Sequence, residues 1–136
     1  MMENINYIVY PGINHLLKEI NCEMIIKSVC DFLCRNIEDV QKNIKKREVV
    51  ELRQICHFFA VELLQRKKIE TFENIGKKIG DRNYCTVLNS HNVCCDLFEF
   101  DSKFRSKLSA INLKLTGTAL TSITRIERKW LKIARE

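Results

Sequence analysis

Apolar side chains recur at every third or fourth position along most of this chain, the spacing that places them on one face of an α-helix. The longest such run covers residues 48–68, with apolar positions at Val49, Leu52, Cys56, Phe59, Ala60, Leu63 and Leu64. One proline and four glycines leave few points at which helices must stop. We therefore predict an all-α fold in which residues 48–68 form the central core helix.

Two helices are predicted ahead of this one. Asn21 is a typical N-cap residue, and the helix that it begins has an inward face. That face consists of Met24, Ile25, Val29, Phe32 and Leu33. Asn36, with Asp39 three positions later, resembles a capping box for a short helix over residues 37–42. A basic connector, "KNIKKR" at residues 42–47, follows.

A helix-turn-helix is predicted over residues 71–95. Thr71 is a typical N-cap, and Gly80 is typical of the position just past a helix C-terminus, so the first helix lies between them. Asn83 caps the second helix, whose first residues, "NYCT", are polar or small rather than core-forming. We therefore expect an exposed helix start in this unit. A further helix begins at Asp101 or Ser102 and is interrupted by Gly117.

The last segment, residues 117–136, is predicted to form an amphipathic basic helix. Its apolar face consists of Leu120, Ile123, Ile126, Trp130 and Ile133. This face must be covered, either by folding back onto the core or by pairing with a second copy to form a homodimer. The predicted organisation is thus a lead-in over residues 1–20, a helix-turn-helix domain over residues 21–116 and the C-terminal helix over residues 117–136.

Composition narrows the classes of function. The net charge of +6 favours a polyanionic partner or simply a solvated basic surface. Seven cysteines in a chain without a secretory signal are expected to be reduced and mostly buried. The Cys-x-x-x-Cys and His-x-x-Cys spacings lack the paired Cys-x-x-Cys set of a structural zinc site, so we expect no metal and no cofactor. Adjacent Cys56 and His57 diverge on a helix and cannot form a nucleophilic dyad, so no enzyme is predicted.

No window approaches the ~18 apolar residues that a membrane-spanning helix needs, so a cytoplasmic protein is expected.

The motifs along the chain resemble those of one family. From residue 25 to about residue 115, the order of features is similar to the C-terminal DNA-binding domain (domain IV) of the bacterial replication initiator DnaA. The specific matches, in order, are Arg53-Gln54, Ile75-Gly76, Ile79-Gly80, Arg82 and Thr86-Val87-Leu88. The resemblance implies a helix-turn-helix of the Trp-repressor-like type and double-stranded DNA as partner, hence association with the nucleoid.

The resemblance also implies a DNA-binding set. It implies that residues at the helix start contact base edges, and these are Asn83, Tyr84, Cys85 and Thr86. Arg82, just before them, matches the signature arginine of the family. Arg53 matches an arginine that reaches into the minor groove. Phosphate contacts fall to Lys45, Lys46, Arg47, Lys77 and Lys78. The alternatives are that Asn83 is only an N-cap, that Arg53 pairs with a nearby glutamate, and that the lysines are solvated.

Departures from the family pattern leave a second function open. Asp81 occupies a position where the family has glycine, and Glu51 one where a basic residue is common. A protein-interaction module that binds the replication initiator or another protein is therefore the alternative to DNA reading. No G-x-x-x-x-G-K-[ST] phosphate loop occurs in the sequence, so we expect a free-standing domain without the ATPase of full initiators, acting in replication initiation or transcription regulation.

Overall fold

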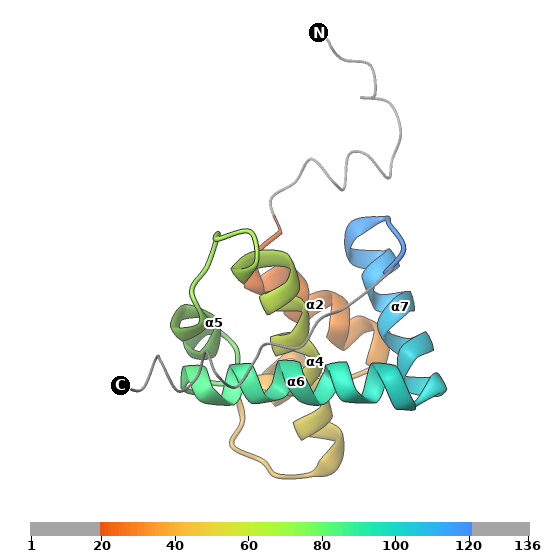
Figure 1. Ribbon diagram of the computed structural model, residues 1–136. Helices are drawn as coiled ribbons and strands as arrows, with labels where there is room; N and C mark the ends of the chain where they lie inside the picture. Colours follow the sequence, from red (N-terminus) through yellow and green to blue (C-terminus); the bar gives the residue numbers. More distant parts are fainter. Residues whose placement is uncertain (1–19, 121–136) are drawn as a thin grey trace, which may run out of the picture.

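The computed structural model describes residues 20–120 (Figure 1). Within this range every regular element is a helix, which confirms the all-α prediction. The elements are α2 (Cys22–Leu33), α3 (Ile37–Gln41), α4 (Arg47–Ala60), the π-helical turn η2 (Val61–Gln65), α5 (Phe72–Lys78), α6 (Tyr84–Phe100) and α7 (Ser102–Thr116). The predicted helix over residues 117–136 lies outside the described residues beyond position 120.

Helix α4 is the central core element, as predicted. Leu52, Ile55, Phe58 and Phe59 are fully buried along it. Figure 1 shows α6 running across α4, with α5 at one end of α6 and α7 at the other. The helix-turn-helix therefore rests on α4 through its second helix; α2 also packs on α4, and α7 packs against both α6 and α2.

Three predicted caps are confirmed, at Asn21, Thr71 and Asn83, and Asp101 caps the helix that was predicted to begin at Asp101 or Ser102. The side-chain oxygens of Asn21, Thr71, Asn83 and Asp101 each accept backbone N–H groups of the first turn that follows. These bonds satisfy donors that have no partner inside the helix, and each typically contributes about 1 kcal/mol. Asn36 is the exception: it precedes α3, but its side chain makes no capping bond, so the predicted capping box does not form.

Three other expectations need correction. The predicted helix over residues 48–68 is α-helical only to Ala60, because η2 widens the next turn and Arg66 N–H donates to Val61 O at 3.0 Å. The second helix of the helix-turn-helix is longer than predicted and reaches Phe100. Phe32, assigned to the core, is 40% exposed, since it lies in the last turn of α2 at the edge of the core.

The cysteines follow the prediction from composition. All seven are free thiols, and five of them are buried. Burial raises the pKa of Cys22 and of Cys30 to about 11, so both remain protonated at neutral pH and behave as apolar groups. Residues 20–120 contain no group of three or more His, Cys, Asp or Glu side chains that could hold a metal ion. None of the helices in that range is both long enough and apolar enough to cross a membrane.

Candidate nucleic-acid interface

The turn between α5 and α6 is tight because backbone packs directly on backbone there. The N–H of Arg82 donates to the carbonyl oxygen of Gly76 at 2.8 Å. A Cβ added to Gly76 would lie 2.1 Å from Arg82 O, so this position has no room for a side chain. Gly80 and Asp81 have φ angles of +83° and +50°. Glycine adopts this left-handed region without steric cost, and aspartate tolerates it.

The first turn of α6 is polar and accessible. Asn83 and Thr86 are exposed, and Tyr84 and Cys85 are half-buried. Asn83 Oδ1 accepts from Thr86 N at 3.0 Å and from Thr86 Oγ1 at 3.2 Å. The first turn of α6 carries no acidic residue, so the positive end of the helix dipole is not compensated within it. Such a helix start favours a nearby anion.

A buried histidine holds this helix start in place. His57 on α4 contacts Ile79 O through Nε2 at 2.9 Å and Ser90 Oγ through Nδ1 at 3.1 Å. A carbonyl oxygen only accepts, so Nε2 carries the proton and Nδ1 accepts from the Ser90 hydroxyl. Burial lowers the pKa of His57 to about 4, although the bond to Ile79 opposes this shift. The neutral ring thus ties the end of α5 to the middle of α6.

Arg53 fixes the path of the basic connector. Its guanidinium donates to Val40 O at 3.2 Å, to Lys42 O at 3.0 Å and to Ile44 O at 2.8 Å. The residue is 7% exposed, and burial followed by the like charge of Arg82 lowers its pKa. Three of the five guanidinium N–H groups therefore bond the backbone of the same chain, and the minor-groove contact expected of Arg53 stays a prediction. Arg53 does not pair with Glu48 or Glu51, which contact Arg35 and Lys107 instead.

Three further bonds join the helix-turn-helix to the end of α3 and to the connector. Gln41 donates from Nε2 to Lys78 O at 2.9 Å and accepts from Gly80 N at 3.0 Å, which satisfies backbone groups at the end of α5. Arg82 donates from Nη2 to Asn43 Oδ1 at 3.3 Å. Residues 42–46 and the turn at residues 79–83 therefore form one connected surface beside the start of α6.

The predicted phosphate-contacting cations differ in their surroundings. Lys45, Lys46 and Arg47 are exposed, and the structure records no ion pair for them within residues 20–120. Lys77 is also exposed. Lys78, by contrast, is paired with Glu70, which raises the pKa of this lysine and occupies its ammonium group. A phosphate must compete with a carboxylate at Lys78 but not at Lys45.

The sequence did not identify Gln41, Asn43 or His57 as part of the site. Each acts on a residue at least twenty positions away, so no local spacing marks the contact. A histidine on the apolar face of a predicted core helix is the one signal that could have pointed to His57. These residues position the interface, and the charged and polar groups at its surface remain those that the motifs indicated.

Comparison with known proteins gives the same family. The chain matches the family described as "Bacterial dnaA protein helix-turn-helix" over residues 22–93. It is 31% identical over 115 residues to the chromosomal replication initiator protein DnaA of Flavobacterium psychrophilum, covering 85% of this chain and 23% of that protein. The DnaA protein of Bacteroides thetaiotaomicron is 28% identical over 115 residues (83% and 23%). That of Wolbachia pipientis is 28% identical over 98 residues (72% and 20%).

The chain thus spans about a fifth of the length of these curated relatives. The family match itself covers more than half of the chain, from the start of α2 into α6, and includes the whole turn described above. The matched domain is a helix-turn-helix that binds DNA rather than a catalytic unit, in agreement with the all-helical fold. Fold, motifs and comparisons agree: the chain belongs to the bacterial DnaA helix-turn-helix family.

Proposed function

We propose that this chain binds double-stranded DNA in a sequence-dependent manner, with the start of α6 in the major groove and the basic connector on the phosphates. The observation that carries the proposal is the connected surface. The exposed polar turn at residues 83–86 and the cations at residues 45–47 belong to segments that Arg82 and Gln41 hold together. A helix start of this kind reads base edges, and flanking cations fix its register.

The capping bonds refine which side chains read bases. Thr86 N and Thr86 Oγ1 both donate to Asn83 Oδ1, so Asn83 would have to give up the hydroxyl bond in order to bond an adenine bidentately. Base reading is therefore assigned chiefly to Tyr84, Cys85 and Thr86. Lys45, Lys46, Arg47 and Lys77 contribute phosphate contacts, while Lys78 contributes less because Glu70 holds it.

Selection from a random duplex library tests the proposal, with the family's consensus box added as a control. Thr86→Val keeps the shape of the side chain and removes the hydroxyl, so discrimination at one base pair should fall by ~1 to 3 kcal/mol. Lys46→Ala should instead weaken binding to all duplexes alike and reduce the salt slope by about 1. If wild-type protein enriches no sequence, sequence-dependent binding is excluded.

The relatives' name places them in chromosomal replication initiation. We propose that this chain acts at DNA in the cytoplasm, at origin-like or regulatory sites. Asp81 beside the turn and Glu51 near the connector motivate the second candidate, a protein-interaction module. A pull-down partner retained by Thr86→Arg, together with no duplex binding at ~50 mM salt, would favour that candidate, since low salt maximises phosphate binding.

The apolar stripe predicted for residues 120–133 is proposed to be covered either by the core of its own chain or by a second copy. Truncation after Leu120 tests this while keeping the contacts that residues 117–120 make. Leu120 packs partly against the core, and Thr118 O accepts from Asn112 Nδ2 at 3.0 Å. In light scattering, a mass that falls from dimer to monomer supports pairing. An unchanged monomer mass with lower thermal stability supports folding back.

A further inference from the structure

A groove of about 490 Å³ lies between the starts of α4 and α7 and the end of α6. Its walls carry four cations from three segments: Lys45 of the connector, Arg47 of α4, and Lys103 and Lys107 of α7. Gln54 and Phe104 also line it. Lys103 and Lys107 belong to none of the motifs that identified the family.

The acidic side chains in this groove are already engaged. Glu51 Oε1 accepts from Lys107 Nζ at 2.6 Å, and that ammonium also lies 5.8 Å from the centroid of the Phe104 ring. Asp101 Oδ1 accepts from Lys103 N at 3.0 Å and Phe104 N at 3.2 Å, capping α7. No ion pair is recorded for Lys45, Arg47 or Lys103 within the described range. The groove therefore presents net positive charge to an incoming anion.

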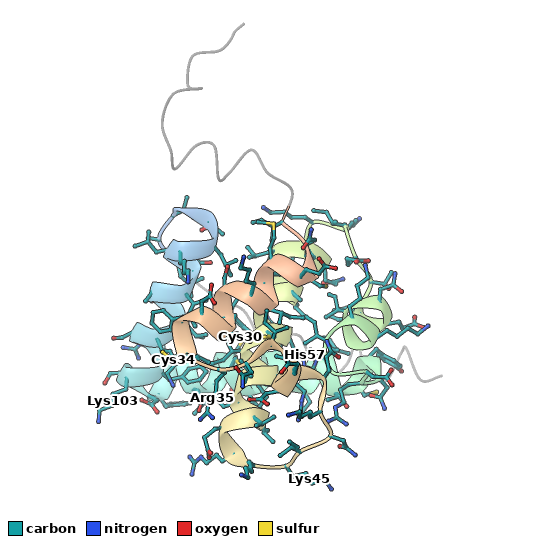
Figure 2. All side chains as sticks on the ribbon, turned by 180° about the vertical axis from the view of Figure 1, so that it is seen from behind. Cys30, Cys34, Arg35, Lys45, His57 and Lys103 are labelled. Carbon is teal, nitrogen blue, oxygen red and sulfur yellow. The ribbon has the colours of Figure 1, made fainter. Side chains whose placement is uncertain are left out.

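The groove continues the surface described above. The connector contacts the helix-turn-helix through Asn43 and enters the groove through Lys45 two residues later. Arg53 bonds the backbone on both sides of Asn43, at Lys42 and Ile44, so the connector is held in one path between the two regions. Figure 2 shows Lys45 at the tip of this connector and Lys103 at the end of the molecule where α7 begins, with His57 in the interior.

We propose that this groove binds the sugar–phosphate backbone of duplex DNA flanking the segment read by α6, with Lys103 and Lys45 contacting phosphates from opposite walls. The inference rests on the proposed function, because the same duplex occupies both regions. DNA is the occupant that fits, since the groove is cationic, adjoins the connector and belongs to a DNA-binding family. Lys107 also lines the groove, but its ammonium group is already paired with Glu51.

Binding to two duplex lengths tests the proposal with the full chain. The short duplex carries the selected site within about one helical turn, and the long duplex extends it by about a turn on each side. Lys103→Ala should weaken binding to the long duplex several-fold and reduce its salt slope by about 1, with no change on the short duplex. Glu51→Gln, which removes the carboxylate, should strengthen binding to the long duplex.

Lys114→Ala is the matched control. This lysine is on the same helix, about 16 Å from Lys103 along the axis, and lies 4.0 Å from Asp31 rather than in the groove. The Lys114→Ala change removes the same charge as Lys103→Ala. Because this charge lies outside the groove, binding to both duplexes should be unchanged. Hydroxyl-radical footprinting should show flanking backbone protection for wild type and Lys114→Ala, and loss of that protection for Lys103→Ala. Thermal unfolding of each variant verifies that the fold is intact.

Distinct outcomes separate the two proposals. If Lys103→Ala leaves the footprint and the salt slope unchanged, the proposal that the groove binds DNA is wrong. Sequence-dependent binding to the short duplex would still support the proposed function. If Lys103→Ala weakens binding to both duplexes equally, the groove does not contact the flanking DNA. Wild-type protein that binds neither duplex overturns the proposed function itself. An acidic protein segment whose capture depends on Lys103, with no effect of Lys103→Ala on DNA, overturns the assignment of the groove to DNA.

Discussion

Gly76 and Arg82 are in backbone contact across the turn of the helix-turn-helix: Arg82 N–H donates to Gly76 O at 2.8 Å, and a Cβ at position 76 would lie 2.1 Å from Arg82 O. The obstacle is a carbonyl of the main chain, which cannot rotate away as a side chain could. The angle between α5 and α6 therefore depends on the absence of a side chain at one residue.

Gly76→Ala should destabilise the domain by about 1 to 3 kcal/mol, because an added methyl in a filled space forces the backbone apart. In a helix without this contact the same change would stabilise by roughly 0.5 to 1 kcal/mol, so the sign of the effect is diagnostic. Urea unfolding measures the change in free energy. An increase in stability would show that the turn opens at little cost.

Stability should decrease as the pH falls from 6.5 toward 4, because of His57. Its pKa is about 4 in the folded protein against 6.5 for an unperturbed histidine, so the unfolded chain takes up the proton first. The contribution is complete above pH 6.5 and is lost as the pH falls through 4, a total of about 3 kcal/mol. Urea unfolding between pH 7.5 and 4.5 measures this slope.

His57→Gln is the matched variant for that measurement. It should lower stability at pH 7 and remove the part of the slope that belongs to this histidine, while His91 is kept. Burial raises the pKa of Glu62, but His91 and Arg66 lower it by more; this group is present in both proteins, so its contribution cancels in the comparison. A slope that persists unchanged in His57→Gln would assign the pH dependence to another group.

Arg53→Lys should lower stability by about 2 to 4 kcal/mol despite keeping the charge. A lysine ammonium cannot reproduce the planar fork that reaches Val40, Lys42 and Ile44, and the carbonyls left without a donor are partly buried. Thermal unfolding and duplex binding should fall together, because the connector loses its fixed path. An intact melting temperature combined with a lost preference for A·T-rich flanks would instead support a minor-groove contact by Arg53.

Asp81→Asn should strengthen duplex binding without changing the fold. Asp81 has φ +50° in the turn, and asparagine tolerates this conformation equally well. The change removes an exposed negative charge beside the start of α6, where phosphates are expected, so affinity should rise at low salt and the gain should shrink as salt screens it. Fluorescence anisotropy at two salt concentrations measures the effect. No gain at low salt would place the duplex away from this turn.

Local sequence signals accounted for the elements of the fold. The 3.6-residue apolar period located α4 at the centre, and Asn21, Thr71, Asn83 and Asp101 fixed helix starts because a cap bonds N–H groups only two or three positions away. The family motifs identified the turn and the exposed polar start of α6 for the same reason. Caps and motifs of this kind depend only on residues a few positions apart, so the sequence alone shows them.

The tertiary contacts decided what the individual polar side chains do. Arg53, which its motif assigns to a DNA contact, also donates to the carbonyl of Val40 in α3 and to those of Lys42 and Ile44 in the connector. His57 and Gln41 bond groups 22 and 39 positions away, and the groove at Lys103 forms where the connector meets α7. A buried hydrogen bond and a charged groove both depend on which distant segments the core brings together, and no spacing along the chain encodes that distance.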